Sequence, residues 1–98
     1  MPTETDEALD RRADDLVRNH ENLLDALVAM RKRHGLTQAE VAERMGVTQP
    51  SVAQFERYDS NPTLSTIRRY AMAVGAVVKS QVVDDIAVEK ASAAAVFA

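Results

Sequence analysis

Apolar side chains recur every three or four positions along the first third of the chain, which is the spacing of one face of an α-helix. This pattern predicts one long helix over residues 8–34. Its expected inner face consists of Ala13, Leu16, Val17, His20, Leu23, Leu24, Leu27 and Val28. Gly35 is a suitable residue to end the helix, and the basic run over 31–34 places positive charge in the last turn, where the helix dipole favours it.

Two short amphipathic segments follow, and they meet at Gly46, which can adopt the positive φ of a sharp turn. Thr37 and Glu40 have the spacing of a capping box, so the second helix is predicted to start there and to end near Met45. Its expected inner face is Ala39, Val41, Ala42 and Met45.

The third predicted helix begins after Thr48, a suitable N-cap, and carries Pro50 in its first turn, where the missing N–H of proline costs nothing. Val52 and Phe55 are spaced to point inward. The outer side then consists of Gln49, Ser51, Ala53 and Gln54. This composition favours a role in recognition, because glutamine can pair with both hydrogen-bonding groups at the edge of an adenine and serine can donate or accept.

A turn containing Asn61 and Pro62 precedes the fourth predicted helix, about 64–74, with Thr63 as its cap. The inner stripe of this helix is expected to be Leu64, Ile67, Ala71 and Val74. Its first turn presents free backbone N–H groups together with Ser65, a combination that can hold a phosphate.

The character of the sequence changes after Gly75. Residues 76–84 are rich in valine and roughly alternating, which predicts a strand. An isolated strand is unstable, so a symmetry-related copy is its expected partner in a homodimer. Residues 1–7 are expected to be disordered, and the alanine-rich residues 85–98 to form a flexible tail.

The composition limits the classes of protein. A chain of 98 residues is long enough for a single small domain, expected over 8–75. It has no cysteine, so disulfides and thiolate metal sites are excluded, and a cytoplasmic location is expected. No apolar run approaches the roughly 18 residues of a membrane span. The two histidines, His20 and His34, do not have metal-site spacing, and no catalytic constellation is present, so we expect neither a cofactor nor an enzyme.

The net charge of −3 is unevenly distributed. Residues 1–17 carry six acidic side chains against two arginines, whereas residues 31–69 carry seven basic side chains against four acidic ones. Phosphates respond to the field within about 10 Å rather than to the sum over the chain. The basic excess lies on residues 31–69, the end of the long helix together with the three short helices, and this is the region where contact with a nucleic acid would occur.

Residues 36–75 resemble the helix-turn-helix domain of the Cro/cI type, the XRE family, which occurs in phage repressors and in antitoxins of the HigA and HipB kinds. The residues that carry the resemblance are Leu36 to Ala42, Gly46 to Gln49, Ser51, Val52, Phe55, Glu56 and Asn61 to Leu64. The resemblance implies a mainly α, lambda-repressor-like domain of four to five helices. The long N-terminal helix and the C-terminal strand would be additions to it.

The resemblance also implies roles for individual residues. Base contacts are expected from Gln49, Pro50, Ser51 and Gln54, with Pro50 in a position where relatives often carry a polar side chain. Phosphate contacts are expected from Gln38, Thr48, Arg57, Asn61, Thr63, Ser65 and Arg68. Arg31 and Glu56 match a pair that forms a partly buried ion pair in some relatives.

Two functions remain open at this point. The first is a dimeric, sequence-specific repressor of bacterial or phage origin that binds double-stranded DNA. The second is an antitoxin or adaptor whose main role is to bind a partner protein, such as a toxin, through the acidic N-terminal helix or through the strand. The sequence gives no indication of a membrane partner.

Overall fold

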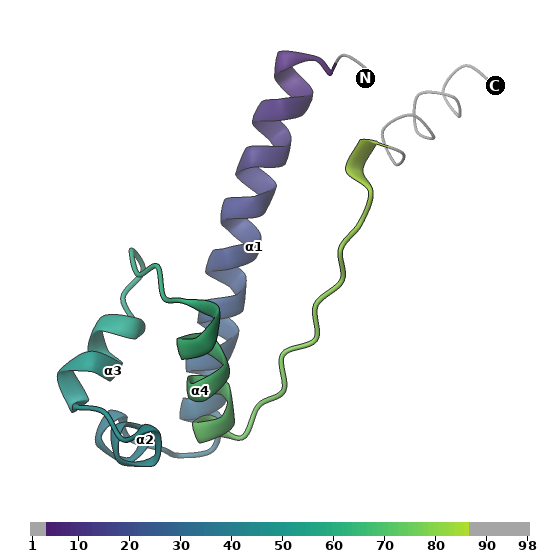
Figure 1. Ribbon diagram of the computed structural model, residues 1–98. Helices are drawn as coiled ribbons and strands as arrows, with labels where there is room; N and C mark the ends of the chain where they lie inside the picture. The colour runs from purple at the N-terminus through teal and green to yellow at the C-terminus, as the bar shows by residue number, and fades with distance from the viewer. Residues whose placement is uncertain (1–3, 87–98) are drawn as a thin grey trace.

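Four helices form, in the order that the sequence predicts (Figure 1). They are α1 (Asp6–Arg33), α2 (Gln38–Met45), α3 (Gln49–Phe55) and α4 (Leu64–Val74). This computed structural model describes residues 4–86. Within that range the architecture is entirely helical apart from turns and one extended segment.

Threonine side chains begin all four helices. Thr37, Thr48 and Thr63 each accept a hydrogen bond from the backbone N–H three residues on, and Thr37 is part of a complete capping box. These three caps were expected. Thr5 adds a fourth by accepting from Ala8, so α1 begins at Asp6 and includes two residues of the segment that was expected to be disordered. Each such cap is worth about 1 kcal/mol of helix stability.

The core lies between α2, α3, α4 and the C-terminal half of α1. Its buried side chains are Leu24, Leu27, Val41, Ala42, Met45, Val52, Phe55, Ile67, Tyr70, Ala71, Ala73 and Val74. Phe55 and Tyr70 stack with their ring centroids 4.2 Å apart, which joins α3 to α4.

Two residues of the short helices that were expected in the core are exposed. Leu64 is 70% exposed at the start of α4, whereas Tyr70, on the face shared by Ile67 and Val74, is fully buried. Ala39 in the first turn of α2 is also exposed. The inner face of α4 is therefore Ile67, Tyr70, Ala71 and Val74.

Two arginines connect the C-terminal ends of α2 and α4. Arg44 on α2 donates to the carbonyl of Ala73 (2.9 Å), and Arg69 on α4 donates to the carbonyl of Met45 (2.5 Å). Each arginine thus caps the other helix at its negative end, where helix carbonyls lack partners and positive charge is favoured.

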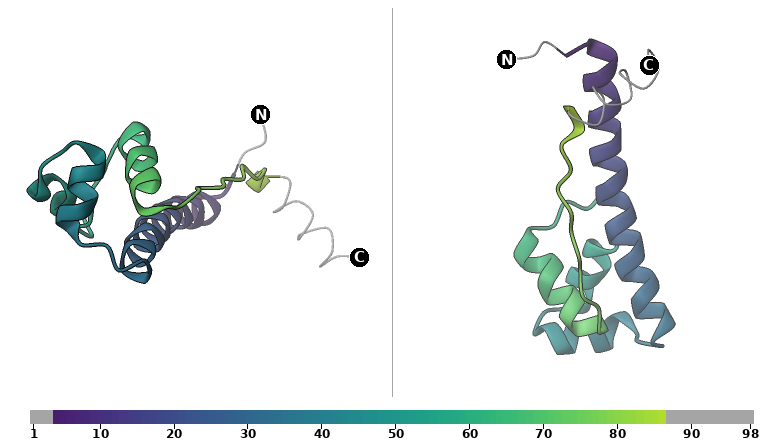
Figure 2. Two further views of the ribbon diagram at one scale, coloured as in Figure 1. Left: turned by 90° about the horizontal axis from the view of Figure 1, so that it is seen from below. Right: turned by 90° about the vertical axis from the view of Figure 1, so that its right-hand side faces the viewer.

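The N-terminal half of α1 extends beyond the other helices (Figure 2). A helix of 28 residues is about 42 Å long, whereas the 11 residues of α4 cover about 16 Å. The apolar face of α1 was expected to be buried along its whole length. Instead Leu24 and Leu27 are buried, while Leu16 and Val17 are 64% and 58% exposed, because α2, α3 and α4 pack only against the C-terminal half of α1.

The strand expected over residues 76–84 is not formed. This segment runs in an extended path from the end of α4 back along α1 (Figures 1 and 2). Strand hydrogen bonds require a second strand, and residues 4–86 supply none. The far end of the segment is attached to α1 by an ion pair between Arg12 and Asp85 (2.7 Å). Residues 87–98, most of the expected tail, lie outside the described residues.

No helix in the described part of the chain is long and apolar enough to cross a membrane.

Candidate nucleic-acid interface

Helix α3 has one buried and one exposed side. Val52 and Phe55 are 1% and 4% exposed. Gln49, Pro50, Ser51 and Gln54 are all exposed. The four residues expected to contact bases therefore share the outer side of a helix whose inner side is fixed in the core. Such a helix can enter the major groove of DNA without disturbing the packing behind it.

The first turn of α3 is held by its own cap. Thr48 accepts from the N–H of Ser51, and the hydroxyls of the two residues lie 2.8 Å apart, at hydrogen-bond distance. Both hydroxyls are exposed and retain further hydrogen-bonding capacity. They are available to a phosphate or a base edge next to the start of the helix.

The carboxylate of Glu56, directly after α3, receives hydrogen bonds from three other helices. Arg31 on α1 donates through Nε (2.7 Å) and Nη2 (2.9 Å) in a bidentate pair. Gln38 on α2 donates to the same carboxylate at 3.1 Å, and the hydroxyl of Tyr70 on α4 donates at 2.7 Å. Glu56 therefore fixes the C-terminal end of α3 relative to α1, α2 and α4.

This cluster is largely removed from solvent, with the side chains of Arg31 and Glu56 12% and 8% exposed. Burial by itself would raise the pKa of Glu56, but the hydrogen bonds from Arg31, Tyr70 and Gln38 outweigh it and lower that pKa. Burial and the Glu56 carboxylate raise the pKa of Tyr70, so its hydroxyl remains a donor. The cluster is thus an ionised, fully hydrogen-bonded brace.

The residues expected to contact phosphate fall into two groups. Thr48, Arg57, Asn61, Thr63 and Ser65 are exposed around α3 and the turn that follows it, and Gln38 is half-buried beside Glu56. Arg57 forms an exposed ion pair with Asp59 (3.1 Å). Arg68 is also exposed on α4, three residues after Ser65, and it lines a hollow with Met72 of the same helix and Val77 of the extended segment.

Tyr70 is a member of the Glu56 cluster that the sequence pattern did not single out. It falls on the same face of α4 as Ile67 and Val74, so its burial was foreseeable from the spacing. The hydrogen bond from Tyr70 to Glu56 was not foreseeable, because it joins residues that are far apart in the sequence.

The arrangement of a capped second helix, a sharp turn and a third helix with an exposed polar side is that of a helix-turn-helix. The sequence model of the family described as Helix-turn-helix matches residues 27–77. The chain belongs to this family. The match covers α2, α3 and α4 together with the end of α1, and leaves the projecting half of α1 outside it.

Three relatives are similar to this region. Antitoxin HigA1 of Mycobacterium tuberculosis is 57% identical over 54 residues, which are 55% of this chain and 36% of that protein. Antitoxin HipB of Escherichia coli is 36% identical over 44 residues, 45% of this chain and 50% of that protein. An uncharacterized HTH-type transcriptional regulator of Methanothermobacter thermautotrophicus is 44% identical over 45 residues, 46% of this chain and 65% of that protein.

The chain thus spans about a third of the length of HigA1 and half that of HipB. No solved structure is a significant match.

Proposed function

We propose that this helix-turn-helix protein is a sequence-specific transcriptional regulator that binds double-stranded DNA as a dimeric repressor. The observation that carries the proposal is the exposed polar side of α3, held in a fixed orientation by the contacts of Glu56 to the other three helices. The printed description of the relative from Methanothermobacter, a transcriptional regulator, supports the same function.

In the proposed complex α3 lies in the major groove. Gln49 and Gln54 are the side chains able to make the two hydrogen bonds that identify an adenine, and such a pair contributes about 1–3 kcal/mol of discrimination against another base. Ser51 can donate to or accept from a base edge, and Pro50 can contact a thymine methyl group.

Contacts to phosphate would hold this helix in register. Gln38 keeps its amide oxygen and a second N–H after bonding Glu56, so it can both brace α3 and meet the DNA backbone. Thr48, Arg57, Asn61, Thr63 and Ser65 surround the outer side of α3 and its following turn. They would position the protein without reading the sequence.

Dimerisation would be provided by residues 76–84. Their backbone is extended and has no strand partner among residues 4–86, and Val77 and Val82 are 83% and 100% exposed. Pairing with the same segment of a second copy would satisfy the backbone and cover these valines. A two-fold dimer would read half-sites about 34 Å apart, one helical turn of DNA.

Selection of bound duplexes from random DNA at about 150 mM salt, close to physiological ionic strength, tests the proposal. We expect a two-fold motif with spaced half-sites. The control is the double substitution Gln49→Ala and Gln54→Ala, which leaves the buried side of α3 intact and should abolish enrichment of that motif. A folded wild-type protein that enriches no sequence would contradict the proposal.

A second candidate function, an antitoxin that also binds a toxin, is favoured by the printed names of HigA1 and HipB. The two functions are compatible, because one chain can bind DNA through α3 and a protein through another surface. A toxin gene next to the gene for this chain, whose product co-purifies with it, would support the antitoxin role.

A further inference from the structure

The projecting half of α1 continues the apolar face that is buried in the core. Leu9, Leu16 and Val17 follow one another on the same side of the helix as Leu24 and Leu27. They are 47%, 64% and 58% exposed, whereas Leu24 and Leu27 are 6% and 3% exposed. With Ala13 between them, they form an uncovered apolar stripe more than two turns long that begins where the core ends.

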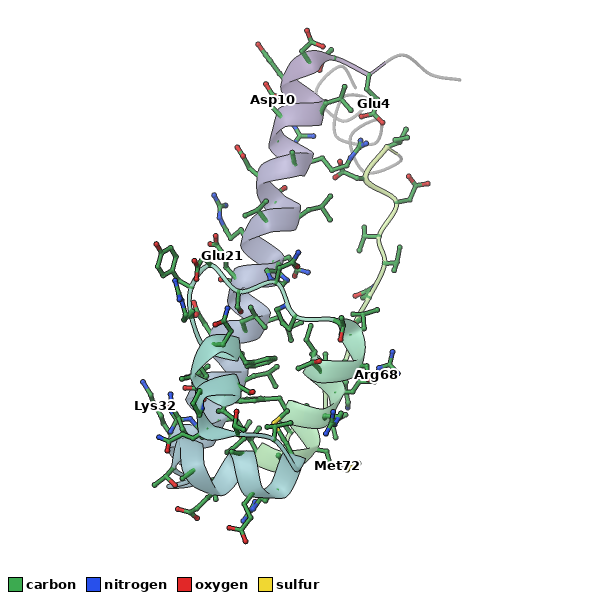
Figure 3. All side chains as sticks on the ribbon, turned by 60° about the vertical axis from the view of Figure 1, so that its left-hand side comes forward. Glu4, Asp10, Glu21, Lys32, Arg68 and Met72 are labelled. Carbon is green, nitrogen blue, oxygen red and sulfur yellow. The ribbon has the colours of Figure 1, made fainter. Side chains whose placement is uncertain are left out.

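An acidic row follows one edge of this stripe. Asp6, Asp10 and Asp14 are four residues apart, so they lie one above another; the exposed Arg18 follows at the same spacing, and Glu21 is the next acid toward the core. Asp10 and Glu21 are on the same side of α1 in Figure 3, away from the extended segment. Among residues 4–86, none of these four carboxylates is in an ion pair.

The opposite edge of the stripe is already occupied. Arg12 lies there and donates to Asp85 of the extended segment and to Glu4. Its remaining neighbours on that edge are Asp15 and Asn19. The stripe is therefore asymmetric, with unpaired acids along one edge and no free positive charge along the other.

This asymmetry disfavours a second copy of α1 as the covering element. In a two-fold antiparallel pair, equivalent edges face each other, so the acidic row would meet its own counterpart. In a parallel pair it would meet the edge with Asp15 and Asn19, where Arg12 is already bound. Like charges facing each other across an interface destabilise it.

The lower end of the acidic row opens into a small hollow. A cavity of about 170 Å³ lies where α1 meets the turn after α3, and it is lined by Glu21, Leu24, Asp25, Val28, Glu56, Arg57 and Tyr58. Tyr58 is 91% exposed. A helix lying along the stripe would reach this aromatic side chain and would meet the acidic Glu21 and Asp25 there, beside the basic Arg57.

We propose that this surface, the apolar stripe with its acidic row, binds an amphipathic helix of another protein whose own apolar stripe is flanked by lysine or arginine. Apolar contact supplies attraction, and the acidic row selects the sign and the side of the partner's charge. The stripe and its acidic row lie on the half of α1 that projects beyond α2 and α3 (Figure 1).

The test uses two synthetic helical peptides of about 21 residues, with leucine at the a and d positions, that differ only in carrying lysine or glutamate along one flank. Binding to the full chain is measured by fluorescence anisotropy. We expect the lysine peptide to bind at least about tenfold more tightly than the glutamate peptide. Leu16→Gln should weaken binding of the lysine peptide about tenfold or more, since a buried leucine contributes at least that much.

Charge substitutions provide a matched comparison. Asp14→Asn should weaken binding of the lysine peptide about two- to fivefold, the range of an exposed ion pair. Glu43→Gln removes one negative charge from the exposed surface of α2 and should leave binding unchanged. Because Leu16 and Asp14 are outside the core, all three variants should keep the thermal unfolding curve and the DNA affinity of the wild type.

Three results would overturn the proposal. The first is that the wild-type chain binds the two peptides equally or binds neither. The second is that Leu16→Gln binds the lysine peptide as tightly as the wild type. The third is that the wild type is a dimer in sedimentation and Leu16→Gln converts it to a monomer. The last would identify a second copy as the covering element. DNA affinity is recorded separately, so failure of this proposal would be distinct from failure of the regulator function.

Discussion

At the scale of single residues, the orientation of the proposed recognition helix depends on the carboxylate of Glu56. Four donors from Arg31, Gln38 and Tyr70 converge on its two oxygens. Removing the charge of the carboxylate leaves the Arg31 guanidinium nearly buried without a counter-ion. An uncompensated buried charge destabilises the folded state more than replacement of both partners would. We therefore expect Glu56→Gln to reduce the free energy of unfolding by roughly 3 kcal/mol, measured by urea denaturation.

Tyr70→Phe is the matched control, because it removes one hydrogen bond to Glu56 and keeps the stacking on Phe55. Its expected cost is about 1.5 kcal/mol. Equal losses for the two variants would show that the ion pair contributes nothing beyond the hydrogen bond.

The lowered pKa of Glu56 predicts how stability depends on pH. The unfolded chain has a Glu56 pKa near its ordinary value of 4.5, and the folded chain has a lower one. The unfolded state therefore binds the proton more readily, so the stabilisation is fully present above about 4.5 and is lost as the pH falls through the folded pKa. Below that pH the free energy of unfolding should fall more steeply for the wild type than for Glu56→Gln. If the two curves of unfolding free energy against pH are parallel, the lowered pKa does not belong to Glu56.

The second residue prediction concerns base recognition. Gln54 is exposed on α3, and its side chain takes no part in the hydrogen bonds of the Thr48 cap or of the Glu56 cluster. Gln54→Ala should weaken binding to the selected operator by about 1–3 kcal/mol and relax the preference at one base pair. Titration against the operator and against random DNA distinguishes the roles, since an equal loss on both would mean that Gln54 does not read a base.

At the scale of elements, what could be predicted from the sequence was set by local interactions. The starts of α2, α3 and α4 followed from Thr37, Thr48 and Thr63, because a cap joins residues only three apart. The periodicity of α1 located its apolar face, but periodicity does not say what covers that face, and Leu16 is exposed. The expected strand is not formed among residues 4–86 for the same reason, since strand pairing is never local to the segment that pairs.

The polar side of α3 could be predicted down to single residues, because a buried Val52 and Phe55 leave only one outward side. The brace behind it could be predicted only in part. The Tyr70–Glu56 contact depends on how α4 crosses α3, and the position of Arg68 beside Val77 depends on the path of the extended segment. Such placements follow from tertiary packing, which short sequence patterns do not encode.

The extended segment yields a prediction at this scale. Val82 is fully exposed, so Val82→Pro removes a backbone donor and disturbs no core contact. If residues 76–84 pair with a second copy, this variant should be monomeric by light scattering at concentrations where the wild type is a dimer. A matched Val82→Thr keeps the backbone donor and should remain dimeric. If Val82→Pro is still a dimer, the interface lies elsewhere on the chain.

At the scale of the whole molecule, a protein with a net charge of −3 binds DNA only if its charges are segregated. The acidic side chains gather on the projecting half of α1, whereas Arg57 lies on the turn after α3 among the expected phosphate contacts. Each phosphate neutralised by such a side chain adds about 0.9 to the slope of log affinity against log salt. Arg57→Gln should therefore reduce the slope by about one per contact and weaken binding to all sequences alike.

Arg68 offers the comparison for this measurement. It has the same charge and is also exposed, but it lines a hollow with Val77 of the extended segment. Arg68→Gln should leave the salt slope close to that of the wild type if DNA lies against α3 and its following turn. A slope that falls with Arg68→Gln and is unchanged by Arg57→Gln would place the DNA backbone along α4 and not at the turn after α3. The proposed docking would then have to be revised, because that turn would no longer hold α3 in register on the DNA backbone.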